Sequence, residues 1–178
     1  MNERPEQRKD PQRRDPVDAI IDQWGTVRPE LDTRAMEVFG RVSRLARAMG
    51  DRLEHAYGRF GISRGEFDVL ATLRRSGEPF TLSPRRLSET LMLTTGGMTG
   101  RLDKLERAGL LRRSPDPHDR RGLQVTLTEE GLRLIDEAAV AGLTVQTEAL
   151  SGLDEKQAGQ LAGLLRELLA GTEGTAGR

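Results

Sequence analysis

The chain has 178 residues, of which 35% are hydrophobic and 31% charged, and its formal net charge is zero. The absence of cysteine excludes disulfides, thiolate metal sites and cysteine-based oxidant sensing. The two histidines lack a carboxylate cluster beside them, so we expect no metal site. No apolar run approaches the roughly 20 residues that span a bilayer, and residues 1–15 lack a secretory signal. We therefore expect a cytoplasmic protein built from helices that each bury one face.

The N-terminal part is expected to hold an arm and two helices. Residues 1–15 mix charges with Pro and Gln and are expected to be disordered. Residues 16–30 form a short amphipathic helix that carries Trp24. A long helix within 31–60 follows, with apolar residues every three or four positions. So long a one-sided stripe needs a partner helix along its length.

A capping box marks the next helix. Ser63 and Glu66 stand three residues apart, so that each side chain closes a free backbone N–H group of the other residue. The helix is expected to end near Gly77, and a short strand is expected over 79–82. Ser83 then precedes Pro84, the typical start of a further short helix.

Another helix is expected to run to Ala108, capped by either Thr94 or Thr95. Two strands, over 110–114 and 123–127, flank a charged hairpin. In the second strand, apolar and polar residues alternate with the period of a half-buried strand. This order of elements predicts a winged helix-turn-helix over 61–127. The fold class is mainly α with a small β-hairpin wing (α+β).

The C-terminal part is expected to hold two more helices. Thr128 caps a long helix that runs to about Leu150, and Asp154 and Gln157 mark the start of a second one with a leucine stripe. Residues 171–178 are expected to be a disordered tail. Segments 31–60 and 128–170 together are predicted to form a helical dimerisation region.

The helix expected over 95–108 has two different faces. Met98, Leu102 and Leu105 share one face, which we expect to be buried. The opposite face presents Gly96, Thr99, Gly100, Asp103 and Arg107. Each glycine in a helix costs about 1 kcal/mol relative to Ala. Two interpretations stay open: a loose or late-starting helix, or a backbone that lies close to phosphates or base edges.

Basic residues gather in the same region. Lys and Arg outnumber Asp and Glu between Pro84 and Arg121, which suits a basic patch for nucleic acid. Arg120 and Arg121 at the hairpin tip are either a solvated charged turn or contacts to phosphate or the minor groove, and the neighbouring helix-turn-helix favours the contacts. The predicted DNA contacts are Ser83, Arg85, Arg86, Thr94, Thr95, Gly96, Thr99, Gly100, Arg107, Arg120 and Arg121.

The stretch LSETLMLTTGGMTGRLDKLERAGLLRRSPDPHDRRGLQVTLTEEG closely resembles the core of the MarR family of bacterial regulators. The wing motif D-x-R-R is matched by Asp116 or Asp119 with Arg120 and Arg121, and the likeness extends over about residues 32–170. The resemblance implies a homodimer whose first and last helices interlock. Two-fold symmetry then implies a pseudo-palindromic DNA site with half-sites about 34–36 Å apart.

A smaller branch of the family, which responds to urate or to acids such as trans-aconitate, is similar in having an added N-terminal helix. The resemblance implies a ligand site made of Trp24, Asp68, Arg101 and Arg113. On this hypothesis Asp68 pairs with Arg101 or Arg113 until a small anion competes for the arginines and DNA is released. The alternative is that Arg101 and Asp68 form only a structural ion pair and that Trp24 anchors the added helix.

We therefore predict a ligand-responsive regulator, by family default a repressor, that binds duplex DNA as a homodimer and is released by trans-aconitate, citrate or urate. The alternative is a winged-helix module for protein docking or architectural DNA binding that has no small-molecule ligand. An enzyme is not expected, because there is no Ser-His-Asp set and no phosphate-binding Gly loop. No cofactor and no membrane partner are expected.

Overall fold

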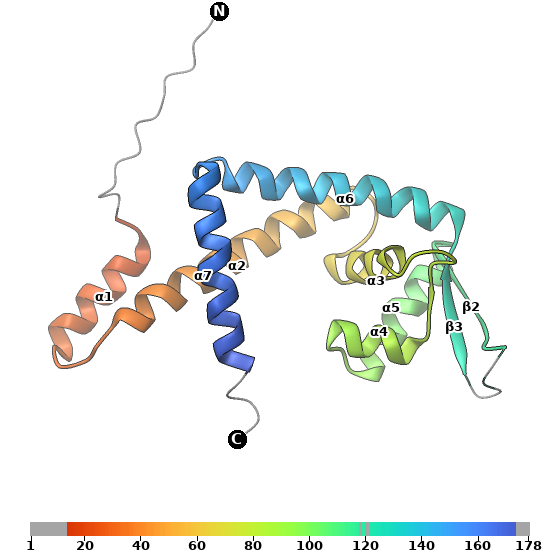
Figure 1. Ribbon diagram of the computed structural model, residues 1–178, viewed down its shortest axis with the longest axis horizontal. Helices are drawn as coiled ribbons and strands as arrows, with labels where there is room; N and C mark the ends of the chain where they lie inside the picture. Colours follow the sequence, from red (N-terminus) through yellow and green to blue (C-terminus); the bar gives the residue numbers. More distant parts are fainter. Residues whose placement is uncertain (1–13, 118, 120–121, 174–178) are drawn as a thin grey trace, which may run out of the picture. The chain divides into compact units, whose positions relative to one another are not determined.

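Figure 1 shows a computed structural model of the chain, which describes residues 14–117, 119 and 122–173. This part is mainly helical with one small antiparallel sheet, so the predicted fold class is confirmed. In chain order its elements are α1 (Pro16–Val27), α2 (Arg34–Gly58), α3 (Arg64–Arg75), β1 (Thr81–Leu82), α4 (Pro84–Leu91), α5 (Thr95–Arg107), β2 (Leu111–Pro115), β3 (Leu123–Leu127), α6 (Glu129–Leu150) and α7 (Glu155–Glu173). No helix among the described residues is long and apolar enough to cross a membrane.

The backbone contacts divide the chain into two units, one up to Met49 and one from Gly50 onward, and the boundary falls within α2. In the N-terminal unit, Asp15 caps α1 by accepting hydrogen bonds from the backbone of Val17 and Asp18. The Arg41 guanidinium of α2 binds the Asp15 and Asp18 carboxylates at 2.8 and 2.6 Å. These contacts join α1 to the first half of α2.

The sheet of the C-terminal unit has the order β1-β3-β2. Figure 1 shows β2 and β3 as the hairpin that the wing pattern predicted, beside α3, α4 and α5. Val125 in the central strand is fully buried and packs into a core of aliphatic side chains. Strand β1 is shorter than predicted because Phe80 has a φ of 56°, which is not an extended conformation.

The predicted caps are present. Ser63 and Glu66 form a capping box at the start of α3. Thr94 rather than Thr95 caps α5, since its hydroxyl accepts the Gly97 N–H at 3.3 Å. The Thr128 hydroxyl accepts the Gly131 N–H at 3.0 Å. These local bonds define where the helices begin.

Helix α6 begins in close contact with the turn that precedes β2. Thr128 donates its backbone N–H to the Leu110 carbonyl at 3.2 Å and its hydroxyl to the Gly109 carbonyl at 2.7 Å. A Cβ atom at Gly131 would lie 1.9 Å from the Leu110 carbonyl oxygen. Only a glycine therefore permits this approach of α6 to the backbone of the turn before β2.

We predict that Gly131→Ala lowers the free energy of unfolding by about 1–3 kcal/mol, because backbone atoms must move to admit the methyl group. Gly159→Ala in α7 is the matched control, since a Cβ there meets nothing within 4 Å, and it should stabilise the chain by up to about 1 kcal/mol. Urea unfolding followed by circular dichroism measures both. Equal effects of the two substitutions would contradict the prediction.

Candidate nucleic-acid interface

Helix α5, hereafter the recognition helix because it carries more of the DNA contacts that the sequence predicts than any other element, has one buried and one open face. Met98, Leu102 and Leu105 are almost fully buried in the core, as the spacing predicted. The residues on the other face that lie exposed are Gly96, Thr99, Gly100 and Arg107. The helix is continuous from Thr95 and includes all three glycines, so it does not start late.

The glycines on the open face meet no packing constraint within the protein. A Cβ atom at Gly96 or Gly100 would have nothing within 4 Å, whereas at Gly97 it would lie 3.3 Å from the Thr94 hydroxyl. The fold itself therefore does not require glycine at positions 96 and 100, although alanine would favour the helix.

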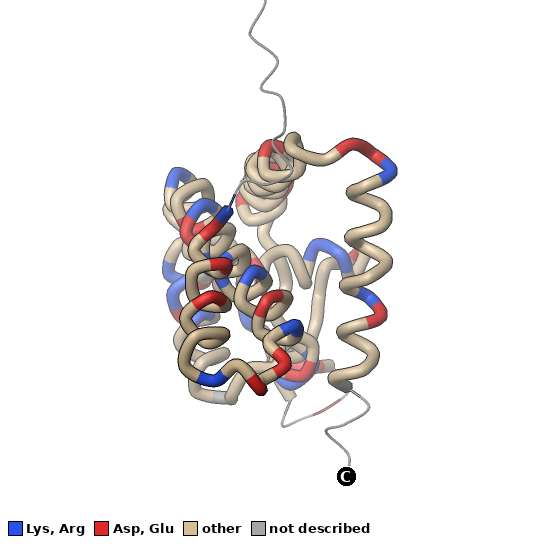
Figure 2. Tube along the Cα trace, turned by 90° about the vertical axis from the view of Figure 1, so that its left-hand side faces the viewer, with Lys and Arg blue, Asp and Glu red and all other residues tan. Residues whose placement is uncertain are grey.

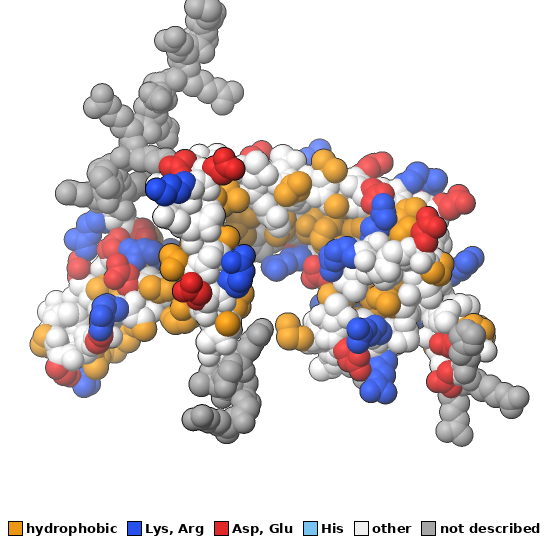
Figure 3. All heavy atoms as spheres, in the orientation of Figure 1, with side chains coloured by type: hydrophobic (Ala, Val, Ile, Leu, Met, Phe, Trp, Pro, Cys, Tyr) orange, Lys and Arg blue, Asp and Glu red, His pale blue; other side chains and the backbone are white. Residues whose placement is uncertain are grey.

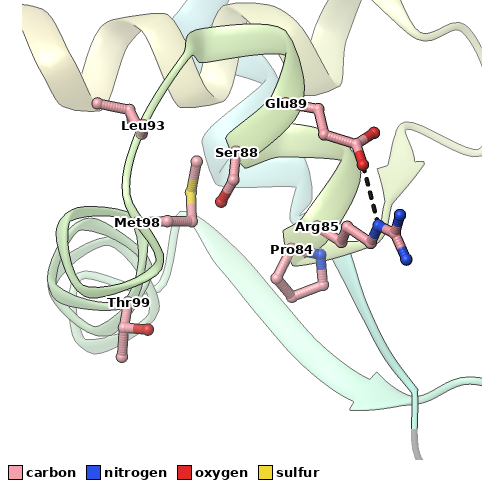
Figure 4. A pocket seen from close by; sticks show the side chains of 7 residues that line it. All are labelled: Pro84, Arg85, Ser88, Glu89, Leu93, Met98 and Thr99. Carbon is pink, nitrogen blue, oxygen red and sulfur yellow. Dashed lines mark hydrogen bonds and ion pairs between the residues drawn. The ribbon is translucent and has the colours of Figure 1, made fainter.

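A shallow pocket of about 320 Å³ lies between α4 and the recognition helix (Figure 4). At its α4 side, Ser83 caps the helix by accepting the Arg86 N–H at 3.2 Å. Arg85 forms an exposed ion pair with Glu89 at 2.9 Å, and Arg86 lies 3.8 Å from the same carboxylate. Such exposed pairs are weak and leave both guanidinium groups accessible to an anion.

Fewer basic side chains are available to bind nucleic acid than the sequence count indicates, because some of them are paired with acidic side chains. Arg113 binds Glu106 at 2.5 Å and Asp103 at 2.7 Å, and the hydrogen bonds from Arg113 hold the pKa of Glu106 below its ordinary value. Figure 2 shows basic and acidic positions interspersed along the chain. Arg107 and Arg112 are exposed and form no ion pair with another described residue. Sequence reasoning missed Arg112, because a charge count cannot show which cations are paired.

The recognition helix is tied to the first turn of α3 by two cations. Lys104 Nζ lies 2.8 Å from Oε1 of Glu66, whose side chain is only 5% exposed. Arg101 donates to the Gly65 carbonyl at 3.3 Å, and a Cβ at Gly65 would lie 2.6 Å from the Arg101 Cζ. The sequence predicted Glu66 as a cap, but not its second role as the partner of Lys104.

Burial alone would raise the pKa of Glu66. The hydrogen bonds from Lys104 and Ser63 outweigh burial and lower this pKa below its ordinary value. The carboxylate is therefore charged near neutral pH and accepts both the Ser63 N–H, at 2.8 Å, and the Lys104 ammonium.

The ion pair expected at the predicted ligand site is not formed. Asp68 pairs with neither Arg101 nor Arg113. Arg113 is instead bound by Asp103 and Glu106, since its own backbone N–H also donates to Glu106 and keeps the two residues together. Asp68 lies half-buried near Tyr57, whose pKa is raised by burial and by the Asp68 charge.

The remaining predicted site residues lie either in the N-terminal unit or outside the described part of the chain. Trp24 is 37% exposed and belongs to the N-terminal unit, whereas the other three predicted ligand residues belong to the C-terminal unit. Arg120, Arg121 and the Thr95 side chain lie outside the described residues. Among the described residues, no cluster of three or more His, Asp or Glu side chains could hold a metal ion.

The sequence is similar to those of known proteins. Residues 60–122 match a family model described as the MarR family. The chain is 38% identical to the HTH-type transcriptional regulator PecS of Dickeya dadantii over 149 residues, which cover 84% of this chain and 90% of PecS. The chain belongs to the MarR family of transcriptional regulators. This MarR-family chain is also 32% identical to the HTH-type transcriptional regulator PapX of Escherichia coli over 64% of its length and 69% of PapX.

Solved structures agree with this assignment. The apo form of E. coli MarR is 26% identical, with a TM-score of 0.63, and the match covers 73% of this chain and 95% of MarR. A MarR mutant complexed with operator DNA matches in fold, with a TM-score of 0.66 at 24% identity, over 82% of this chain and 97% of that one. The MarR-family chain thus shares the fold of these regulators, and its relatives are named as transcriptional regulators.

We predict that Glu66→Gln lowers the free energy of unfolding of this MarR-family chain by about 1–3 kcal/mol near neutral pH, because Lys104 loses a buried anionic partner. The folded pKa of Glu66 is lower than its ordinary value of 4.5. The carboxylate therefore stabilises the fold fully above that value, and the stabilisation is lost as the pH falls through the lower, folded value.

Urea unfolding at a series of pH values measures this effect. The difference between wild type and Glu66→Gln should be constant near neutral pH and shrink in acid. Glu89→Gln, which removes an exposed partner of Arg85, should change stability by less than about 1 kcal/mol. A wild-type advantage that persists undiminished at about pH 2 would contradict the prediction.

Proposed function

We propose that this MarR-family chain acts as a homodimer that binds a pseudo-palindromic DNA site through two recognition helices and is released by a small anionic metabolite. The observation that carries the proposal is the open face of α5. Lys104, Arg101 and the buried leucines hold the helix from one side. The described residues of the open face are small, hydroxylated or basic groups, together with the half-buried Asp103.

This open face suits the major groove, which admits a helix that presents such groups to base edges and phosphates. Gly96 and Gly100 let the backbone approach the DNA, Thr99 offers a hydroxyl, and Arg107 offers a cation. Around it we assign Ser83, Arg85, Arg86, Thr94 and Thr95 to contacts from the helix-turn-helix, and Arg120 and Arg121 to contacts from the wing. Phosphate contacts from these residues position the protein, and base contacts select the sequence.

Exposed apolar side chains support the homodimer. In Figure 3, apolar side chains are visible along the surface of α6. In α6 and α7, the most exposed of them are Val140, Leu143, Leu164 and Leu169, each at least 60% exposed. In the N-terminal unit, Phe39 and Leu45 are more than half exposed. Apolar helix faces of this extent indicate a protein interface, and a second copy would cover them.

We predict that Gly100→Ala stabilises the protein by about 1 kcal/mol yet weakens DNA binding about tenfold or more, because the added methyl group would occupy the space that the DNA backbone or a base edge needs. The probe is a duplex that the wild-type protein selects from a random pool, which should show a two-fold symmetric footprint. Fluorescence anisotropy measures the Kd, and Gly25→Ala in α1, where a Cβ atom would meet nothing within 4 Å, serves as the control that leaves DNA binding unchanged.

A wild-type protein that selects no symmetric site would contradict the homodimeric regulator. A Gly100→Ala variant that binds the duplex as well as wild type would contradict the proposed placement of α5 in the groove.

The surroundings of Arg101 support the proposal that the effector is an anion. The residue is half-buried, and among the described residues its guanidinium donates to the neutral carbonyl of Gly65 rather than to a carboxylate. A partly buried guanidinium gains more from an anion than an exposed one, because less water screens the pair. We assign Arg101, Arg113 and Asp68 to the site, and a carboxylate- or urate-like anion as its ligand. Since Arg101 also holds α5 against α3, an anion that draws it away would shift the recognition helix.

We predict that Arg101→Ala abolishes the response to the effector. Thermal-shift measurements with urate, citrate and trans-aconitate should raise the Tm of wild type with at least one of them. That compound should release wild type, but not Arg101→Ala, from the selected duplex. Arg107→Ala is the control, which should bind DNA more weakly while keeping the thermal shift. An Arg101→Ala variant that the compound still releases from DNA would place the site elsewhere.

A further inference from the structure

Met92 stands out in the turn between α4 and the recognition helix. Its side chain is 93% exposed, far more than that of any other large apolar residue described. Its backbone has φ 51° and ψ 42°, which is the left-handed region. The Leu93 N–H donates to the Ser88 carbonyl at 3.0 Å, and the Met92 N–H donates to the Glu89 carbonyl. This is the pattern that ends a helix with one left-handed residue.

Folding does not account for a methionine at this position. Glycine is the usual residue in a left-handed helix end, because a Cβ atom is unfavourable there. Almost no part of the Met92 side chain packs against the protein, so burial does not offset that cost. By contrast Leu93, the next residue, is half-buried and lines the pocket beside Met98 (Figure 4).

The position of Met92 along the chain indicates what the side chain meets. It stands two residues before Thr94, which caps the recognition helix, and the open face with Gly96 begins two residues later. The N-terminal end of a recognition helix is the part that reaches base edges in helix-turn-helix proteins. An apolar side chain at this end would face the DNA rather than water.

We propose that Met92 is a specificity-determining residue whose side chain packs against the C5-methyl group of a thymine in the major groove. That methyl group is the apolar group that base pairs present in this groove. A methionine suits the contact because its flexible, polarisable thioether adapts to the shape it meets. The inference rests on the proposed function, since it requires α5 to enter the groove.

The experiment uses the duplex selected by the full-length wild-type protein. Each thymine of one half-site and its symmetric mate are replaced in turn by deoxyuridine, which lacks only the methyl group. For wild type, one replacement should weaken binding about fourfold per contact, the value of one buried methyl group. The same replacement should leave the Kd of Met92→Gly unchanged.

Two further variants separate contact from backbone conformation. Met92→Asn tolerates the left-handed region but carries no apolar group, so it should behave like Met92→Gly. Met92→Leu keeps an apolar side chain and should retain the preference for thymine over deoxyuridine. Met92→Gly should also have a higher Tm than wild type, because the backbone cost is removed.

The outcomes distinguish the inference from the proposed function. If wild type selects no symmetric duplex, the proposed function fails and the inference fails with it. If wild type selects such a duplex but every deoxyuridine replacement affects wild type and Met92→Gly equally, only the Met92 contact is overturned. A Met92→Gly variant that loses dimerisation in sedimentation, with its thymine preference intact, would likewise overturn it and assign Met92 to the partner copy.

Discussion

The buried carboxylate of Glu66 connects the start of α3 to the recognition helix α5. It closes the capping box of α3 on the Ser63 backbone and accepts the Lys104 ammonium from the recognition helix. One residue earlier, the Gly65 carbonyl accepts Arg101 from the same helix. A charge at this depth is tolerated only while its partners are in place. The orientation of α5 therefore depends on the first turn of α3, whose Arg64 N–H is in turn bound by Glu54 of α2.

This constraint has a consequence for regulation. Because Arg101 and Lys104 contact the first turn of α3 directly, a change at that turn would act on the recognition helix through these two contacts. The proposed effector acts on one of these two cations. Lys104, paired with a buried carboxylate, would remain as the pivot, so that an anion shifts the helix rather than detaching it.

Two residues on the outer side of the helix-turn-helix make the fold less stable than another residue would at the same position. Gly100 would be replaced by alanine, and Met92 by glycine, if the isolated fold were the only requirement. Local departures from the most stable residue gather at functional surfaces in proteins generally. Here both departures lie on the side of the domain that we assign to DNA, whereas Gly131 is required by its contact with the Leu110 backbone.

Short-range chemistry made much of this protein predictable. Capping boxes join residues three apart, and the periods of helix and strand show which side chains turn inward, so the sequence alone determined the helix starts at Ser63 and Thr128 and the buried face of α5. Only the tertiary structure decided that Glu66 pairs with Lys104, that Arg113 pairs with Glu106 and Asp103 rather than Asp68, and that Gly131 meets a backbone carbonyl while Gly100 meets nothing. The reason is that several acidic side chains can satisfy one cation equally well in the sequence, and the packing of separate elements selects one of them.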